Sequence, residues 1–359
     1  MPENASTTRT AGEAGSSVKT RLPYYPGCTL KTTAKGLEDS AIAVAEVLDI
    51  ALVELPRWNC CGVVTSLTDD DLMRHIAPLR NMVRAQDAVD DGLVDGARVV
   101  TLCSMCFNAL KWSNERITGD AEDLRSINDF MYLENDYRGE VEVVHFLEVL
   151  KEMDPEAISG RVVSPLEGLR VAPYYGCTLL RPKGIGIDDP EDPTIQRDLL
   201  ESMGATVVDS PYKTVCCGSY QTVQDKYAVA ELTHDILEHA RTAGADAVTT
   251  FCPLCAFNLD NRQREVIEKH PGFTPMPVFY FPQLMAVAFG LDPSCCRFDL
   301  NHTDPRPLLR REGQFFLPMV VHRTLKRQGM SAALEAPFKA LGLTRRWGSP
   351  VLAQFNSAE

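Results

Sequence analysis

Ten of the twelve cysteines in the chain form two sets of five, and both sets have the same order. A single cysteine comes first, then an adjacent pair followed by glycine, then two cysteines separated by two residues. The first set consists of Cys28, Cys60, Cys61, Cys103 and Cys106. The second set consists of Cys177, Cys216, Cys217, Cys252 and Cys255. In three pairs of corresponding cysteines, the two members are separated by 149 residues. The sequence therefore predicts two copies of one fold with the same arrangement of ligands.

Three kinds of chemistry suit this pattern of cysteines. A zinc ion takes four tetrahedral ligands, so a fifth thiol has no role, and the neighbours Cys60 and Cys61 diverge too much to chelate one small ion easily. A dithiol-disulfide enzyme uses the Cys-x-x-Cys pair and leaves the other three cysteines of each set idle. An iron-sulfur cluster can use five thiolates, since different iron atoms accept neighbouring sulfurs. We therefore favour an iron-sulfur cluster in each half, with zinc in one half as an alternative.

Alternating strands and helices must position these cysteines. In the first half, strands are predicted at 21–25, 51–55, 97–102 and 141–146. Helices are predicted there at 37–48, at 69–89 and after residue 106, while 119–136 has no clear pattern. The second half repeats the order, with strands at 169–175, 206–209, 247–251 and 278–281. Its helices are predicted at 193–203, 223–241 and 282–289, and a loop at 181–193 absorbs seven additional residues.

The alternation predicts an α/β protein with two pseudo-symmetric Rossmann-like domains and mostly parallel sheets. In such sheets functional groups gather at the carboxyl ends of the strands, where all ten repeated cysteines are expected to lie. We predict a disordered leader at 1–20, a first cysteine-rich domain at 21–160, a second at 161–300 and a basic C-terminal extension at 301–359. The apolar residues of this extension predict an amphipathic helix that covers the body of the protein or docks to a partner.

Composition excludes several classes of protein. The chain has 359 residues, is 45% hydrophobic and 24% charged, and contains no apolar run near the ~18 residues of a membrane span. The leader lacks the apolar core of a secretory signal, so the protein is expected to stay in the cytoplasm, where thiols are kept reduced. The net charge of −13 argues against a nucleic-acid partner.

The double pattern of a single Cys, then Cys-Cys-Gly, then Cys-x-x-Cys resembles the CCG domains in the B subunit of heterodisulfide reductase. The resemblance covers about residues 21–310, including the segment Asp-Pro-Arg-Pro-Leu-Leu at 304–309. It implies a non-cubane 4Fe-4S cluster in each half, with the first set of five cysteines as ligands of one cluster and the second set as ligands of the other. It also implies that a disulfide substrate lies between the clusters and that each cluster captures one of its sulfur atoms.

By this resemblance the chain is expected to be a catalytic subunit that cleaves or forms a disulfide bond of a thiol, disulfide or sulfur-carrier substrate. It lacks a Cys-x-x-Cys-x-x-Cys-x-x-x-Cys-Pro run, so electrons are expected from a ferredoxin-like C subunit, with a flavin-containing A subunit in the same complex. The alternative is an electron-transfer or scaffold subunit with iron-sulfur clusters or zinc, as in lactate, glycolate or fumarate systems. Cys295 and Cys296 lie outside the repeat and receive no role, and His145 and His302 are weak candidates for an acid.

Overall fold

The computed structural model describes residues 19–63 and 72–309, and its strands form two four-stranded sheets in which all neighbours are parallel. The first sheet has the order β2-β1-β3-β4, and its strands are β1 Thr20–Tyr25, β2 Ile50–Glu54, β3 Arg98–Thr101 and β4 Glu142–His145. The second sheet has the order β6-β5-β7-β8, and its strands are β5 Arg170–Pro173, β6 Thr206–Val207, β7 Ala247–Thr250 and β8 Val278–Tyr280. The two orders are equivalent, which confirms the prediction of two pseudo-symmetric Rossmann-like halves.

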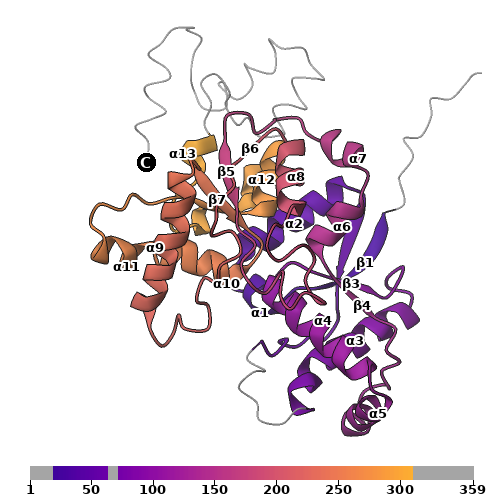
Figure 1. Cartoon of the computed structure of the whole chain (residues 1–359). Helices are drawn as coiled ribbons and strands as arrows, with labels where there is room; N and C mark the ends of the chain where they lie inside the picture. The colour runs from indigo at the N-terminus through magenta and orange to yellow at the C-terminus, as the bar shows by residue number, and fades with distance from the viewer. Residues whose placement is uncertain (1–18, 64–71, 310–359) are drawn as a thin grey trace, which may run out of the picture.

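Helices connect successive strands in both halves (Figure 1). The helices of the first half are α1 Gly27–Leu30, α2 Lys35–Val47, α3 Met73–Asp90, α4 Ser104–Thr118, α5 Ala121–Phe130, α6 Phe146–Glu152 and α7 Pro155–Ser159. Those of the second half are α8 Ile195–Ser202, α9 Lys226–Thr242, α10 Pro253–Ala256, the π-helix η2 Phe257–Asn261, α11 Gln263–Lys269, α12 Phe281–Ala288, the 3-10 helices η3 Pro293–Cys296 and η4 Phe298–Leu300, and α13 Arg306–Leu309. Among the helices in the described ranges, none has the length and apolar character needed to cross a membrane.

The two halves pack against each other through helices α2 and α12. Every residue of α12 is buried, the polar Gln283 included, so this helix is covered on all sides. Part of that cover comes from α2 of the first half, which buries Ala41, Val44 and Ala45. The buried apolar residues of both halves therefore form one continuous core, which fixes how the two sheets sit relative to each other.

The predicted strands are all present, with ends within two residues of the predicted ones. Two helix predictions need correction. The stretch 119–136, which shows no sequence periodicity, contains α5, because the Asp120 side chain caps it by accepting hydrogen bonds from two backbone N–H groups at 2.8 and 3.2 Å. Helix α4 begins at Ser104 and so includes Cys106, whereas the sequence placed the helix after that cysteine. The predicted helix start at residues 69–71 and the predicted tail helix lie outside the described residues.

Candidate functional site

The two Cys-x-x-Cys pairs occupy equivalent strand-to-helix turns. Cys103 follows β3 and is the N-cap of α4, and Cys252 follows β7 and is the N-cap of α10. Their backbones adopt nearly the same extended conformation, with φ −103° and ψ 119° for Cys103 and φ −97° and ψ 118° for Cys252. Cys106 and Cys255 follow in the first turn of each helix, where backbone amides favour negative charge. The predicted position at the carboxyl ends of strands is confirmed for these four residues.

The remaining cysteines lie in the segments that follow the neighbouring strands. Cys28 lies in the short helix α1 directly after β1, and Cys177 lies in the corresponding turn after β5. The two adjacent pairs follow the edge strands β2 and β6, and they lie several residues beyond the strand ends. Both pairs are therefore carried by loops, so their positions depend on hydrogen bonds outside the sheets.

The sulfur atoms of the first set form a connected series. The Sγ atom of Cys60 is 4.0 Å from that of Cys28, and the Sγ atom of Cys61 is 3.4 Å from that of Cys106. The thiol of Cys61 is also close enough to Cys60, and that of Cys103 close enough to Cys106, to raise the pKa of these two neighbours. The structure thus brings all five cysteines of the first set together.

The second set has a similar arrangement. The Sγ atom of Cys217 is 3.3 Å from that of Cys255, and the thiol of Cys255 also contacts that of Cys252. Cys216 and Cys177 form a second thiol pair, and the charges of Cys217 and Cys252 are close enough to raise the pKa of Cys177. All five cysteines of this set are therefore neighbours as well.

The two sets meet at their Cys-x-x-Cys turns. The thiol of Cys103 lies near the thiol of Cys252, and this neighbour is the main reason why the pKa of Cys252 is raised to about 12. Both residues are almost fully buried. Helices α4 and α10 accordingly begin close to each other in the middle of the molecule, where α1 also lies (Figure 1). The ten cysteines therefore make two adjoining sites.

Each site has a buried side and an open side. Cys28 and Cys60 are exposed, and Cys177 and Cys216 are partly exposed. The other six cysteines of the two sets are buried. A ligand from solvent can therefore approach each site from the side of its single cysteine and the first cysteine of its adjacent pair.

Neighbouring thiols in these sites compete for protons. A hydrogen bond from Cys106 is the main cause that lowers the pKa of Cys61 to about 4, whereas Cys103, Cys61 and burial raise the pKa of Cys106 well above its usual range. Five adjacent thiols cannot all ionise without a compensating cation, because like charges repel strongly in a buried site. The donor set therefore suits a positively charged group of several metal ions, which replaces the shared protons.

A tyrosine holds each adjacent cysteine pair in place. The hydroxyl of Tyr25 donates to the backbone oxygen of Asn59 at 2.9 Å, and the hydroxyl of Tyr174 donates to the backbone oxygen of Val215 at 2.6 Å. Each of these carbonyl groups belongs to the residue directly before an adjacent pair. Sequence analysis assigned no role to these tyrosines, although each stands three residues before a single cysteine, and 149 residues separate them.

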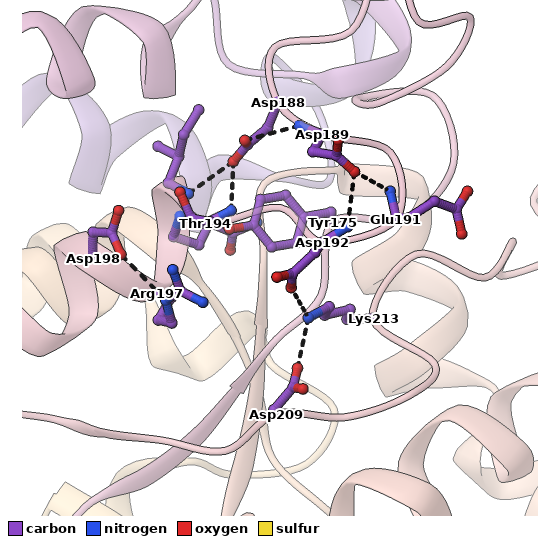
Figure 2. A network of polar contacts seen from close by, with 12 residues as sticks. Tyr175, Asp188, Asp189, Glu191, Asp192, Thr194, Arg197, Asp198, Asp209 and Lys213 are labelled. Carbon is purple, nitrogen blue, oxygen red and sulfur yellow. Dashed lines mark hydrogen bonds and ion pairs between the residues drawn. The ribbon is translucent and has the colours of Figure 1, made fainter.

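A polar network shapes the loop around the single cysteine of the second set (Figure 2). The ammonium group of Lys213 forms ion pairs with Asp192 at 2.8 Å and Asp209 at 2.6 Å. The backbone oxygen of Lys213 accepts hydrogen bonds from the N–H of Tyr175 at 2.9 Å and of the following glycine at 3.2 Å. The predicted loop at 181–193 is confirmed, and the network ties it to the turn that carries the cysteine.

Asn108 of α4 links the two halves next to the sites. Its side-chain amide donates to the backbone oxygens of Thr178 and Arg181, both at 2.8 Å. We expect Asn108→Ala to lower the free energy of unfolding by about 1–3 kcal/mol, because two backbone acceptors lose their partner. It should also speed the alkylation of Cys177, since the loop after this residue becomes free to move. Urea unfolding and timed alkylation with mass spectrometry measure the two effects.

Asn128→Ala is the matched control for this prediction. Asn128 exchanges two hydrogen bonds with the backbone of Tyr137, at 3.1 and 3.0 Å, entirely within the first half. It should cost similar stability and leave the alkylation of Cys177 unchanged. Equal alkylation rates in both variants would contradict the role of Asn108 in holding the second set.

The two histidines named in the sequence, His145 and His302, both have structural contacts in the described part of the chain. His145 is fully buried, and burial lowers its pKa to about 3, so the ring is neutral at physiological pH. Its Nδ1 atom accepts a hydrogen bond from the N–H of Leu147 and caps α6, and its ring packs edge-on against Phe107 and Phe251. His302 donates its backbone N–H to the carboxylate of Asp260 at 2.6 Å. Both histidines have structural contacts.

Cys295 and Cys296 lie on η3, which packs against α2 and α12. Cys296 is buried with its thiol 3.8 Å from the backbone oxygen of Gln283, while Cys295 is partly exposed. The side chain of Gln283 in turn donates to the backbone oxygen of Cys296 at 2.6 Å. This pair therefore contributes to the packing between the two halves.

Comparison with known proteins identifies the relatives of this chain. The family model of the cysteine-rich CCG domain matches residues 22–111 and 171–260, together half of the chain. The chain is 31% identical over 281 residues to the 8-methylmenaquinol:fumarate reductase membrane anchor subunit of Wolinella succinogenes, covering 78% of this chain and 95% of the relative. It is 30% identical over 281 residues to the B subunit of the ferredoxin/F(420)H(2)-dependent CoB-CoM heterodisulfide reductase of Methanosarcina acetivorans, covering 76% and 90%. The B subunit of the ferredoxin:CoB-CoM heterodisulfide reductase of Methanosarcina mazei is also 30% identical, over 289 residues, covering 78% and 93%.

A solved structure shares the fold. It is a hypothetical protein from Helicobacter pylori, with a TM-score of 0.63 and 12% sequence identity, and the match covers 79% of this chain and 53% of that one. The chain thus spans about half the length of that structure, and the likeness concerns the fold alone. The sequence relatives are subunits of oxidoreductase complexes, which supports an oxidoreductase role. With two CCG matches and relatives aligned over most of their length, the chain belongs to the family of heterodisulfide reductase B subunits with cysteine-rich CCG domains.

Proposed function

We propose that the protein is the catalytic subunit of a heterodisulfide-reductase-like complex and cleaves or forms a disulfide bond at two non-cubane 4Fe-4S clusters. The observation that carries this proposal is the proximity of the Cys103 and Cys252 thiols, which begin two equivalent strand-to-helix turns. This proximity supports the proposal, because two neighbouring sites could each face one sulfur atom of the same S–S bond. An electron relay needs two sites within transfer distance but does not need them to share one substrate space.

Each of the proposed domains, 21–160 and 161–300, would hold one cluster. The first set of five cysteines would be the ligands in the first domain, and the second set would be the ligands in the second domain. Such clusters, when bound, supply single electrons and iron positions that accept sulfur. The chain itself buries six of the thiols and leaves the other four accessible, so the substrate would enter from the side of Cys28, Cys60, Cys177 and Cys216.

Zinc has weaker support as the occupant of either half. Within residues 19–63 and 72–309, no group of three or more His, Cys, Asp and Glu side chains is arranged to hold a single metal ion. The sulfur atoms instead form a series of neighbouring pairs that extends over a helix start and two loops. A group with several metal ions can use such a spread donor set, whereas one tetrahedral ion cannot.

The relatives support a role within a complex of several subunits. The names of two relatives describe ferredoxin-linked complexes in which each relative is the B subunit. We propose that a ferredoxin-like C subunit delivers or removes electrons here and that a flavin-containing A subunit belongs to the same complex. The substrate is a thiol, a disulfide or a sulfur carrier, and the cytoplasmic location of the protein stays a prediction.

A second candidate function is electron transfer without sulfur chemistry. The relative from Wolinella succinogenes favours it, because that protein is named as a membrane anchor subunit of a fumarate reductase. In that case the same clusters would carry electrons between partner subunits, and the exposed thiols at the mouth of each site would have no substrate to bind.

Electron paramagnetic resonance separates the two functions. Anaerobically purified protein should contain iron and acid-labile sulfide for two clusters, and oxidised samples should change their signal when 2-mercaptoethanesulfonate is added. A catalytic cluster binds the thiol directly, so its signal must respond. Iron without any thiol response would favour the electron relay, and zinc without iron would overturn both functions and leave a scaffold.

A further inference from the structure

Tyr220 connects the two loops that carry the adjacent cysteine pairs. It lies three residues after Cys217, and its hydroxyl donates to the backbone oxygen of Val63 at 3.4 Å. Val63 itself lies two residues after Cys61. This hydrogen bond joins residues 157 positions apart and crosses from the second half to the first.

The side chain of Tyr220 bridges the loops that follow the two adjacent cysteine pairs and is open to solvent. It is 54% exposed, although it belongs to a loop next to buried thiols. Partial burial raises the pKa of Tyr220, and the charges of Cys177, Cys216 and Cys61 raise it further. Two of these cysteines belong to the second set and one to the first. Together with the hydrogen bond to Val63, these charges indicate that the phenol lies near both sites.

The loop of Tyr220 is held in place by a partly buried arginine. Arg262, at the end of the π-helix η2, donates to the backbone oxygen of Thr222 at 2.9 Å and to its hydroxyl at 3.0 and 3.1 Å. Backbone hydrogen bonds of 2.9 and 2.8 Å close successive turns over residues 218–225. Gly218 allows the loop to begin against α9, since a Cβ there would lie 2.8 Å from Leu232. The exposed phenol thus projects from a constrained loop.

We infer that Tyr220 is a substrate-binding residue whose hydroxyl donates a hydrogen bond to a sulfur atom held between the two cysteine sites. This inference rests on the proposed function, since it requires a sulfur substrate in that space. The bond to the Val63 carbonyl is the one that a substrate would replace. In the reductive direction, two electrons from a reduced iron-sulfur partner convert the disulfide into two thiolates. The phenolic O–H bond stays intact and stabilises one thiolate through a charge-assisted hydrogen bond.

Tyr220→Phe removes the hydroxyl and keeps the ring. Because a hydrogen bond to a charged group is lost, 2-mercaptoethanesulfonate should bind about tenfold more weakly, as measured by titration of the paramagnetic signal. The iron and sulfide content should equal that of the unchanged protein. Tyr227→Phe is the matched control, because Tyr227 is 43% exposed on α9 and its hydroxyl bonds to Glu268 at 3.2 Å. That variant should bind the thiol as the unchanged protein does.

The possible outcomes separate this inference from the proposed function. If the unchanged protein responds to the thiol and Tyr220→Phe binds it equally well, the inference is wrong and the proposed function stands. If Tyr220→Phe loses iron or sulfide, the hydroxyl builds the site and does not bind substrate, which also overturns the inference. If the unchanged protein shows no response to the thiol, the proposed function itself fails.

Discussion

Replacing Cys252 with serine is expected to lower the iron and acid-labile sulfide content to about half and to abolish disulfide cleavage, because one of the two proposed clusters would lose a ligand. Cys252 is almost fully buried, contacts Cys255 and adjoins Cys103 of the other set. A serine hydroxyl is a poor iron ligand, and the remaining thiols would again compete for protons. Cleavage should stop altogether, although the first cluster remains, since the proposed reaction uses one site for each sulfur atom.

Cys296→Ser provides the matched control. Cys296 is as deeply buried as Cys252, with 1% of its surface exposed in both cases, but it lies outside the two sets. This variant should keep its iron, its sulfide and its activity. The assay uses reduced methyl viologen as electron donor and the mixed disulfide of coenzymes M and B as substrate. A Cys252→Ser protein with full iron content would show that Cys252 is not a ligand, and half of the iron with full activity would favour a relay.

Local patterns in the sequence account for the sheets and for the contents of each cysteine set. Strands such as 98–101 and 247–250 are short runs rich in β-branched residues that end just before a Cys-x-x-Cys motif, so the sequence indicates both that they are strands and where they end. The constant separation of 149 residues then predicts equivalent halves. Short helices such as α1 and α6 escaped prediction, because they have too few residues to show a helical period.

The relation between the two sites could not be predicted in the same way. The contact of Cys103 with Cys252 depends on how one sheet sits against the other, which is decided by the packing of α2 on α12. The same holds for Asn108 and Tyr220, whose partners lie 70 and 157 residues away in the other half. The periodicity of apolar residues within one helix or strand carries no information about such contacts. They follow only once the shared core has been assembled.

A glycine with a left-handed backbone stands directly before each single cysteine. Gly27 has φ +71° and Gly176 has φ +67°, a backbone region that L side chains rarely adopt. A Cβ atom on Gly27 would lie 3.0 Å from the sulfur of Cys106, and one on Gly176 would lie 3.2 Å from the sulfur of Cys255. Each glycine thus lets the chain pass directly beside the thiol of the Cys-x-x-Cys motif.

Gly27→Ala should therefore destabilise the protein and empty the first site. The left-handed backbone costs about 1–2 kcal/mol for an alanine. The crowding against Cys106 adds about 1–3 kcal/mol, because this sulfur sits among other buried thiols and has little room to shift. Urea unfolding of metal-free protein measures the sum of the two effects. Iron content after anaerobic reconstitution should fall to about half, as with loss of a ligand.

Gly92→Ala separates the backbone effect from the contact with sulfur. Gly92 has φ +68°, and a Cβ atom there would meet nothing within 4 Å, so its substitution carries the conformational cost alone. This variant should lose about 1–2 kcal/mol of unfolding free energy and keep all of its iron. If Gly27→Ala behaved in the same way, the close approach to Cys106 would not matter for the cluster. Loss of iron in Gly27→Ala alone would instead show that the glycine makes room for sulfur in its metal-bound position.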